Sequence, residues 1–220
     1  MYYLRRLTNY IKKIFSYKFL KRLMDILFSI IVLFFGIPIF IIIITLIKFS
    51  SYGPIFFYQK RLGQNSRIFK CLKFRTMYPE SEDILKNLLE NNISIKEEFN
   101  STHKIKNDPR ITPIGKVLRK TSLDELPQFL NVLRGEMSII GPRPVVKEEI
   151  KKYSSNVNKL LSVKPGISGL WQVSGRNKLT YAKRVELDLL YVKEYNLIMD
   201  LRIIIRTIGV ILFPFDRGAY

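Results

Sequence analysis

The sequence predicts a mostly helical α+β protein with an N-terminal membrane helix that is broken at Pro38. Three observations support this fold class: an uncharged apolar run over residues 26–47, a short two-strand pattern over residues 55–74, and helical patterns over most of the remainder. The last helical pattern, over residues 197–213, sets Asp200, Arg202 and Arg206 against many Ile and Leu residues. That pattern is typical of an amphipathic helix in a membrane interface.

The apolar run is long enough to enter a membrane. Its roughly 22 residues would measure about 33 Å as a straight helix, against about 30 Å for the hydrocarbon core. Basic residues flank it on both sides, which disfavours a single crossing under the positive-inside rule. Gly36 and Pro38 lie inside the run, and a proline within a helix kinks it. The residues alone leave two alternatives open: a re-entrant helix and a kinked spanning helix.

The rest of the chain contains a hairpin and several helices. The strand pattern turns around Gly63-Gln64-Asn65, and Gly141-Pro142-Arg143-Pro144 indicates a rigid loop. We expect two parts: residues 1–48, an amphipathic segment followed by the membrane helix, and residues 49–220, one domain with the interfacial helix at its end. The predicted helices cover residues 80–99, 113–120, 122–134, 147–161, 180–195 and 197–213, with a Pro/Gly turn at 164–169.

The composition indicates polyanionic partners. The chain has 37 Lys and Arg residues against 18 Asp and Glu, a formal net charge of +19. This charge suits nucleic acid, an anionic membrane surface or phosphorylated substrates, and composition does not choose among them. A single cysteine, Cys71, and a single histidine, His103, exclude a disulfide framework and disfavour a zinc site. A bound metal would therefore have oxygen ligands.

The segment from Arg119 to Gln128 holds the candidate chemistry. The sequence lacks GxxxxGK[ST], GxGxxG and Asp-x-Asp motifs, which disfavours the common nucleotide-sugar transferase design. Ser122 and Glu125 fit a capping box, so one interpretation makes Asp124 and Glu125 a helix start and nothing more. The other uses the helix N-terminus, which lowers carboxylate pKa values and presents amides to a phosphate. Arg119, one turn upstream, could bind that phosphate with two hydrogen bonds.

Six motifs in order resemble the monotopic phosphoglycosyl transferase family of bacterial sugar transferases, over about residues 18–212. The motifs are Lys21-Arg22-Leu23-Met24-Asp25, Lys73-Phe74-Arg75-Thr76-Met77, Ser122-Leu123-Asp124-Glu125-Leu126-Pro127-Gln128, Gly141-Pro142-Arg143-Pro144, Pro165-Gly166-Ile167-Ser168-Gly169 and Gly175-Arg176-Asn177.

The resemblance implies a fold of short helices around a small sheet and a re-entrant helix broken at Pro38. It implies a catalytic domain on the cytoplasmic face of a bacterial inner membrane. Asp124 matches the family's nucleophile, which attacks a UDP-sugar, releases UMP and holds the phosphosugar covalently. Glu125 matches its partner, for metal or proton handling when undecaprenyl phosphate attacks.

The same resemblance implies ligands for each substrate group. Asp124 and Glu125 would bind Mg²⁺ or Mn²⁺, since a carboxylate pair suits such an ion. Arg119 matches a phosphate-binding arginine. Lys73, Arg75, Arg143 and Arg176 are further candidate contacts to the substrate, with an ordinary structural salt bridge as the alternative.

The sugar, the product and other partners are predicted less directly. Residues 171–177 and the terminal Arg217-Gly218-Ala219-Tyr220 resemble members that handle galactose, then glucose. The glycan would be a capsule, an exopolysaccharide or an O-antigen type. Anionic lipids and a second copy in a homodimer are further expected partners, and nucleic acid is not. Two alternatives are a noncatalytic basic membrane scaffold and a membrane-tethered nucleic-acid-binding protein, although no nucleic-acid-binding motif is present.

Overall fold

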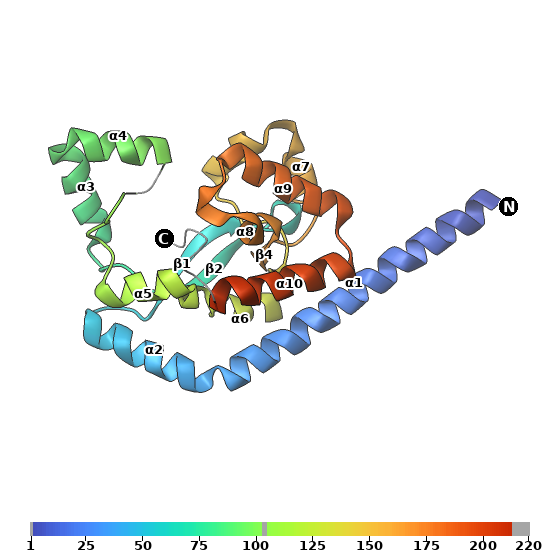
Figure 1. Cartoon of the computed structure of the whole chain (residues 1–220), viewed down its shortest axis with the longest axis horizontal. Coiled ribbons are helices and arrows are strands. Elements are labelled where there is room, and N and C mark those ends of the chain that lie inside the picture. The colour runs from blue at the N-terminus through green and yellow to red at the C-terminus, as the bar shows by residue number, and fades with distance from the viewer. Residues whose placement is uncertain (1, 103–104, 213–220) are drawn as a thin grey trace.

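The computed structural model describes residues 2–102 and 105–212, with backbone only for residues 2–16, 98, 100–102, 177 and 211–212. His103 and the predicted terminal motif at residues 217–220 lie outside the described residues. The helices are α1 Tyr2–Phe35, α2 Ile37–Ser50, α3 Ser81–Asn91, α4 Ile93–Thr102, α5 Pro113–Thr121, α6 Gln128–Leu133, α7 Val157–Leu160, α8 Leu170–Ser174, α9 Tyr181–Glu194 and α10 Leu197–Leu212 (Figure 1). The strands are β1 Phe56–Leu62, β2 Ile68–Phe74, β3 Ser138–Ile140 and β4 Gly166–Ser168.

Helices α1 and α2 meet at a bend of 61°. No single helix among the described residues is long and apolar enough to cross a membrane, whereas the bent pair meets that test by length and composition. The bend lies at Gly36, where an added Cβ atom would come within 2.4 Å of the Val32 carbonyl oxygen. Pro38 occupies the first turn of α2, where its missing N–H interrupts the backbone hydrogen bonds of a continuous helix. The predicted break is therefore confirmed.

Large apolar side chains remain exposed on both arms of the bend and on α10. A protein in water rarely leaves so many together, so this surface suits contact with lipid. On α10 the exposed residues are Ile198, Leu201, Ile205 and Ile208, and on α1 and α2 they include Leu27, Ile31, Phe34, Phe35, Ile39, Ile42, Leu46 and Phe49.

Asp200 does not lie on an exposed polar face of α10, contrary to the sequence pattern. It is fully buried and accepts hydrogen bonds from Tyr17, Lys21 and Tyr191. A buried carboxylate needs such partners, so Asp200 connects α10 to α1 and α9.

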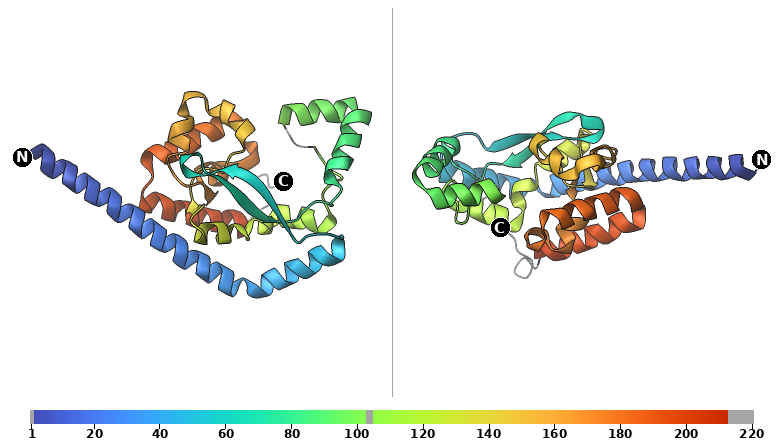
Figure 2. Two further views of the ribbon diagram at one scale, coloured as in Figure 1. Left: turned by 180° about the vertical axis from the view of Figure 1, so that it is seen from behind. Right: turned by 90° about the horizontal axis from the view of Figure 1, so that it is seen from above.

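The interior of α1 is fixed to the rest of the domain by two more polar side chains. Asp25 is buried and accepts hydrogen bonds from the Ser138 hydroxyl and the Ile139 backbone N–H, each at 3.0 Å. Arg22 donates to the carbonyl groups of Val132 and Leu133 at the end of α6. Figure 2 shows α1 passing between the β1–β2 hairpin on one side and α9 and α10 on the other.

The predicted hairpin is confirmed, and a second strand pair was not predicted. Strands β1 and β2 pair antiparallel, with Phe56 opposite Phe74 and Leu62 opposite Ile68. Strands β3 and β4 pair in parallel. The close approach of Gly141 and Gly166 leaves no room for side chains there. The main core lies between these strands, α6 and α10, and includes Val132, Met137, Ile140 and Ile203.

The helix predicted over residues 122–134 is wrong as a continuous element. Thr112 caps α5, which ends at Thr121, and Ser122 takes a left-handed conformation with φ 60°. Residues Leu123–Glu125 form a single 3₁₀ turn, and α6 begins only at Gln128. Pro127 has no N–H for the Leu123 carbonyl, so an α-helix cannot run through it unbroken. The Ser122 side chain makes no capping hydrogen bond, so the capping-box interpretation is also wrong.

Two other predicted helices are divided. Residues 80–99 form α3 and α4, which separate at Asn92. Residues 147–161 form a 3₁₀ segment, Lys147–Asn156, followed by the short helix α7.

The bend leads to a prediction about membrane topology. We expect single cysteines at Lys18 and at Gln64 to be labelled from the same, cytoplasmic side of the membrane. Pro38→Ala restores the missing N–H, so it should move a fraction of molecules to a spanning state in which position 64 is labelled from outside. A membrane-impermeant thiol reagent measures this, and buried Cys71 gives little background.

The matched control is Pro54→Ala, which removes an exposed proline outside the helices and should leave the labelling unchanged. Outside labelling of either position in the protein with Pro38 intact would contradict the re-entrant arrangement.

Candidate active site

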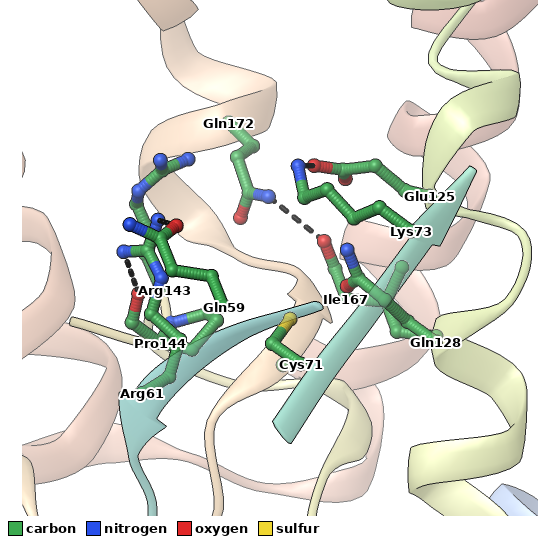
Figure 3. Close-up of a pocket in the computed structure, with 11 residues that line it drawn as sticks. Gln59, Arg61, Cys71, Lys73, Glu125, Gln128, Arg143, Pro144, Ile167 and Gln172 are labelled. Atoms are coloured by element: carbon green, nitrogen blue, oxygen red, sulfur yellow. Dashed lines mark hydrogen bonds and ion pairs between the residues drawn. The ribbon is translucent and has the colours of Figure 1, made fainter. Parts of the chain in front are cut away.

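Lys73 lies against the two adjacent carboxylates of Asp124 and Glu125. Its Nζ atom is 2.6 Å from Glu125 Oε1 and 3.6 Å from Asp124 Oδ2. The three side chains are 27%, 26% and 10% exposed for Lys73, Glu125 and Asp124, so they are partly withdrawn from water. The 3₁₀ turn between α5 and α6 presents both carboxylates, and the end of β2 presents the lysine. Figure 3 shows Lys73 and Glu125 in contact.

Asn131 fixes the distance between these two elements. It is completely buried on α6, and its side-chain Oδ1 accepts from the Leu72 backbone N–H at 3.0 Å. Its Nδ2 group donates to the Lys70 carbonyl at 2.8 Å and to Glu136. The side chain thus pairs with β2 much as a neighbouring strand would, one residue away from Lys73.

Burial and charge move the pKa values of the three groups in different directions. Burial raises the pKa of Asp124, and nearby Glu125 adds to this, although Lys73 opposes it. Burial alone would raise the pKa of Glu125, but the Lys73 ammonium outweighs it and the net shift is downward. Burial would lower the pKa of Lys73, but the two carboxylates outweigh this effect, so the net shift of the Lys73 pKa is upward. The sequence predicts that the helix N-terminus lowers both carboxylate pKa values, and for Asp124 this prediction is wrong. The Asp124 side chain is desolvated, and it lies in a 3₁₀ turn instead of the first turn of an α-helix.

The predicted basic residues lie in different surroundings. Arg119 on α5 donates its Nε hydrogen to the Thr76 hydroxyl, and its charge acts on Asp124. Arg176 donates to the Ser122 hydroxyl at 3.4 Å and acts on Glu125. Arg143 lines a narrow pocket together with Lys73 and Glu125.

Arg75 is not brought to this pocket. Its side chain is buried, and its two terminal nitrogens donate to the carbonyl oxygens of Ser51 and Tyr52. Arg75 therefore holds the connection between α2 and β1, which is the structural alternative to substrate binding.

The narrow pocket has a basic wall that faces the carboxylates. In Figure 3, Arg61 and Arg143 lie on one side, Lys73 and Glu125 on the other, and Gln172 between them. Its volume is about 20 Å³, room for about one water, so side chains must move to admit a larger anion. The sequence reasoning missed Gln59, Arg61, Gln128 and Gln172. Strand alternation could have found the first two, because Gln59 and Arg61 lie on one face of β1.

An apolar cavity of about 160 Å³ begins beside the same carboxylates. Glu125, Ser122 and Arg176 lie among its polar residues. Its apolar walls come from α1, the turn before α6, α6, α8 and α10, and include Phe28, Leu126, Phe129, Val173, Ile204 and Ile208. Glu125 therefore borders both a basic pocket and an apolar cavity, and Asp124 is its neighbour in the chain.

The carboxylate pair offers part of a metal site. Among the described residues, no group of three or more His, Cys, Asp and Glu side chains could hold an ion. Asp124 and Glu125 supply carboxylate oxygens, and Mg²⁺ is commonly held by one or two carboxylates together with substrate phosphates. The donor set therefore fits Mg²⁺ or Mn²⁺ when a diphosphate provides further oxygens.

Comparison with known proteins decides the family. Residues 16–214 match the model of the bacterial sugar transferase family. The chain belongs to this family. The sugar transferase is 46% identical to the exopolysaccharide production protein ExoY of Sinorhizobium fredii. The aligned 200 residues cover 91% of this chain and 88% of that protein.

Two longer relatives have names that state a reaction. The sugar transferase is 44% identical to the undecaprenyl-phosphate galactose phosphotransferase of Salmonella typhimurium, over 99% of this chain and 45% of that protein. It is 40% identical to the UDP-glucose:undecaprenyl-phosphate glucose-1-phosphate transferase of Klebsiella pneumoniae, over 86% of this chain and 39% of that protein.

The three coupled charges lead to a prediction about stability. Lys73→Met leaves two adjacent carboxylates without their cation, so the pKa of each should rise in the folded state. A carboxyl group with a raised folded-state pKa destabilises the fold as pH increases. We expect Lys73→Met to lower the free energy of unfolding by about 1 to 3 kcal/mol at pH 7.5, and by less at pH 5.

Denaturant unfolding of the detergent-solubilised protein at the two pH values measures this difference. Lys70→Met is the matched control, because Lys70 is exposed on the opposite face of β2, over the Tyr58 ring. An equal loss of stability at both pH values for Lys73→Met would argue against the coupling.

Proposed function

We propose that the chain transfers a hexose 1-phosphate from a UDP-sugar to undecaprenyl phosphate, through a covalent phosphosugar on Asp124. The observation that carries this proposal is the position of Asp124: a desolvated carboxylate beside Lys73 and next to Glu125, the residue that lines both the basic pocket and the apolar cavity. The family supports the class of reaction, and the two longer relatives support these substrates by name.

In the first step, an ionised Asp124 oxygen attacks the phosphorus that carries the sugar. A bond forms between this oxygen and phosphorus, and the bond from phosphorus to the oxygen bridging the two phosphates breaks. UMP leaves with the bridging oxygen and its electron pair. Burial favours the attack because a desolvated carboxylate is less stabilised by water, while Lys73 and Arg119 offset the negative charge of the phosphates.

In the second step, an oxygen of undecaprenyl phosphate attacks the same phosphorus and displaces Asp124 as a carboxylate. Glu125 accepts a proton if the acceptor phosphate carries one, because Lys73 keeps the pKa of Glu125 low and the side chain ionised. The apolar cavity is suited to the first part of the prenyl chain, and Arg176 lies beside it to meet the phosphate. The cavity is smaller than a typical ligand pocket of about 300 Å³ or more, so most of the chain would remain in lipid.

Asp124 and Glu125 would hold Mg²⁺ or Mn²⁺ together with the donor phosphates, and the ion would supply further neutralisation of their charge. Lys73 contributes a second, permanent cation at the same carboxylates. Together these positive charges would reduce the repulsion between the carboxylate and the diphosphate.

The sugar, the product and the location follow from the relatives and the membrane arm. We assign galactose first and glucose second, because the relative named for galactose is 44% identical to this chain and the relative named for glucose is 40% identical. The relative named for exopolysaccharide production supports a role at the start of such a glycan. The bent apolar pair and the basic flanks support a cytoplasmic-face location in a bacterial membrane.

The mechanism leads to a prediction for Asp124→Asn. An amide cannot form the acyl phosphate, so we expect loss of turnover and loss of UMP release. Incubation of the unmodified enzyme with labelled UDP-galactose and no lipid should leave hydroxylamine-sensitive label on Asp124, with an equal amount of UMP. The stability of Asp124→Asn should change by no more than about 1 kcal/mol, because the two side chains have the same shape.

Glu125→Gln is the companion variant. If Glu125 handles the proton or the metal, this variant should lose most turnover while some labelled intermediate still accumulates. Label on another residue, or full activity of Asp124→Asn, would refute the assignment. Release of UDP instead of UMP would indicate transfer of the sugar without its phosphate.

The donor set leads to a prediction about metal. We expect activity to require Mg²⁺ or Mn²⁺ and to persist with a zinc-selective chelator, because the site offers oxygen ligands only. The assay measures UMP release in EDTA, with each ion then restored in excess. Full activity in excess EDTA would show that Lys73 and the arginines suffice.

A further inference from the structure

Two arginines, Arg143 and Arg184, lie against the ring of Trp171. The Arg143 Cζ atom is 5.7 Å from the centroid of the Trp171 ring, and the Arg184 Cζ atom is 4.9 Å from it. Trp171 is only 5% exposed, so the two guanidinium groups are positioned by a buried, rigid ring. Within the described part of the chain, neither guanidinium forms an ion pair or a hydrogen bond.

Several donors in this cluster are buried without an acceptor. The indole Nε1 of Trp171 and the Nε of Arg184 are both inaccessible to solvent and unpartnered among the described residues. Buried donors are nearly always satisfied in folded proteins, yet neither of these two is bonded to the unpartnered acceptors nearby, Gln172 Oε1 and Asp188 Oδ1. A phosphate group has only acceptor oxygens and would satisfy the two donors.

The cluster also carries excess positive charge. Burial lowers the pKa of Arg61, and Arg143 lowers it further; the same two causes lower the pKa of Arg184. Repulsion among three neighbouring cations is a cost that a bound anion relieves.

Three carboxylates act on the cluster and do not balance it: Glu125, across the pocket, is paired with Lys73, and the other two are Glu149 and Asp188. Glu149 is 3.4 Å from Arg61 and is the ion-pair partner of that residue. Asp188 is buried under the Arg143 loop, accepts a hydrogen bond from the Tyr153 hydroxyl, and lies near the Arg143 backbone N–H. Burial raises the pKa of Asp188 to about 7, so its negative charge is weakened compared with that of an ordinary carboxylate.

The place of the cluster identifies its ligand. Arg143 lines the basic pocket opposite Lys73 and Glu125, which the proposed mechanism assigns to the phosphate that carries the sugar. The donor has a second phosphate, next to the nucleoside, which must lie close to the first one. Arg61 and Arg143 form the part of the pocket across from Glu125, where a second phosphate avoids its charge, and Arg184 shares the Trp171 ring with Arg143.

From these observations we infer that Arg143 and Arg184, which both lie against the Trp171 ring, form the subsite for the nucleoside phosphate of the donor and of the departing UMP. The inference rests on the proposed function. Arg184 becomes a substrate-binding residue that lies outside the six sequence motifs. Because this phosphate keeps its place in the leaving group, Arg184 acts mainly on donor binding and product release.

The test compares UMP with uridine as probes, by calorimetry on the full-length protein in detergent. Arg184→Gln should weaken UMP binding by about 10- to 100-fold, the range for a hydrogen bond to a charged group, and leave uridine binding unchanged. The UMP affinity of Arg184→Lys should lie between those of the unmodified protein and Arg184→Gln, because lysine keeps the charge and loses the planar group over Trp171. In steady state, KM for the UDP-sugar and the inhibition constant of UMP should rise together, with a smaller change in kcat.

Lys183→Gln is the matched control. Lys183 precedes Arg184 on α9, faces solvent and pairs with Glu186, so its loss removes one charge from the same helix without touching the pocket. If Arg184→Gln unfolds the protein, Arg184→Lys provides the same comparison at constant charge.

Two outcomes would overturn the inference. One is a folded Arg184→Gln protein with unchanged UMP affinity. The other is the pattern expected if Arg184 serves only as the counter-ion of Asp188. Arg184→Gln would then lower thermal stability, addition of Asp188→Asn would restore it, and the UMP affinity of both proteins would equal that of the unmodified protein.

Inorganic pyrophosphate separates this inference from the proposed function. If the unmodified protein releases no UMP from any UDP-sugar, the proposed function fails, and the subsite is still tested by pyrophosphate. Weaker pyrophosphate binding by Arg184→Gln then supports an anion site, and equal binding refutes it.

Discussion

The buried side chain of Asn131 is the contact on which the candidate site depends. It connects α6 to the backbone of β2 on both sides of Cys71, through one donated and one accepted hydrogen bond. Lys73 follows on β2, and the carboxylates precede α6 by a few residues, so this amide fixes the ammonium opposite them. A short hairpin is marginally stable alone, and here it gains its position from a polar group that the core could not leave unpaired.

The site separates two substrates that differ in polarity. The basic pocket offers guanidinium groups to a charged nucleotide, while the cavity toward α1 and α10 offers apolar walls to a lipid. The carboxylate pair belongs to the border between them. A two-step reaction with a covalent intermediate suits this geometry, because each substrate can use its own side of the pair in turn.

Much of the fold could be predicted from local pattern. The apolar run, its break, the hairpin and the helices after Thr112 and Thr180 all depend on short-range signals, and the structure confirms them. The parallel pair of β3 and β4 depends on a contact between segments far apart in the chain, and its three-residue strands are too short for a periodic signal. The 3₁₀ turn at Asp124 was missed because Ser122 and Glu125 matched a capping pattern that the left-handed Ser122 does not use.

The site shows the same division. The motifs led to Lys73, Asp124, Glu125 and Arg143, which lie in or beside one pocket, while Arg75 turned out to fasten a loop. Burial could not be read from the sequence, and burial is what raises the pKa of Asp124. Arg184 carries no motif, and only the packing of α8 against α9 places it over Trp171.

The attachment of α1 has a consequence for how a lipid reaches the enzyme. Arg22 and Asp25 join α1 to α6 and β3, which contribute to the cavity wall, and α6 follows the turn that presents the carboxylates. With the bent pair embedded as proposed, these contacts would hold the membrane arm and the reaction centre together, at one height above the bilayer plane. A lipid acceptor that diffuses sideways in the leaflet would then arrive at the correct depth, and its search would have two dimensions instead of three.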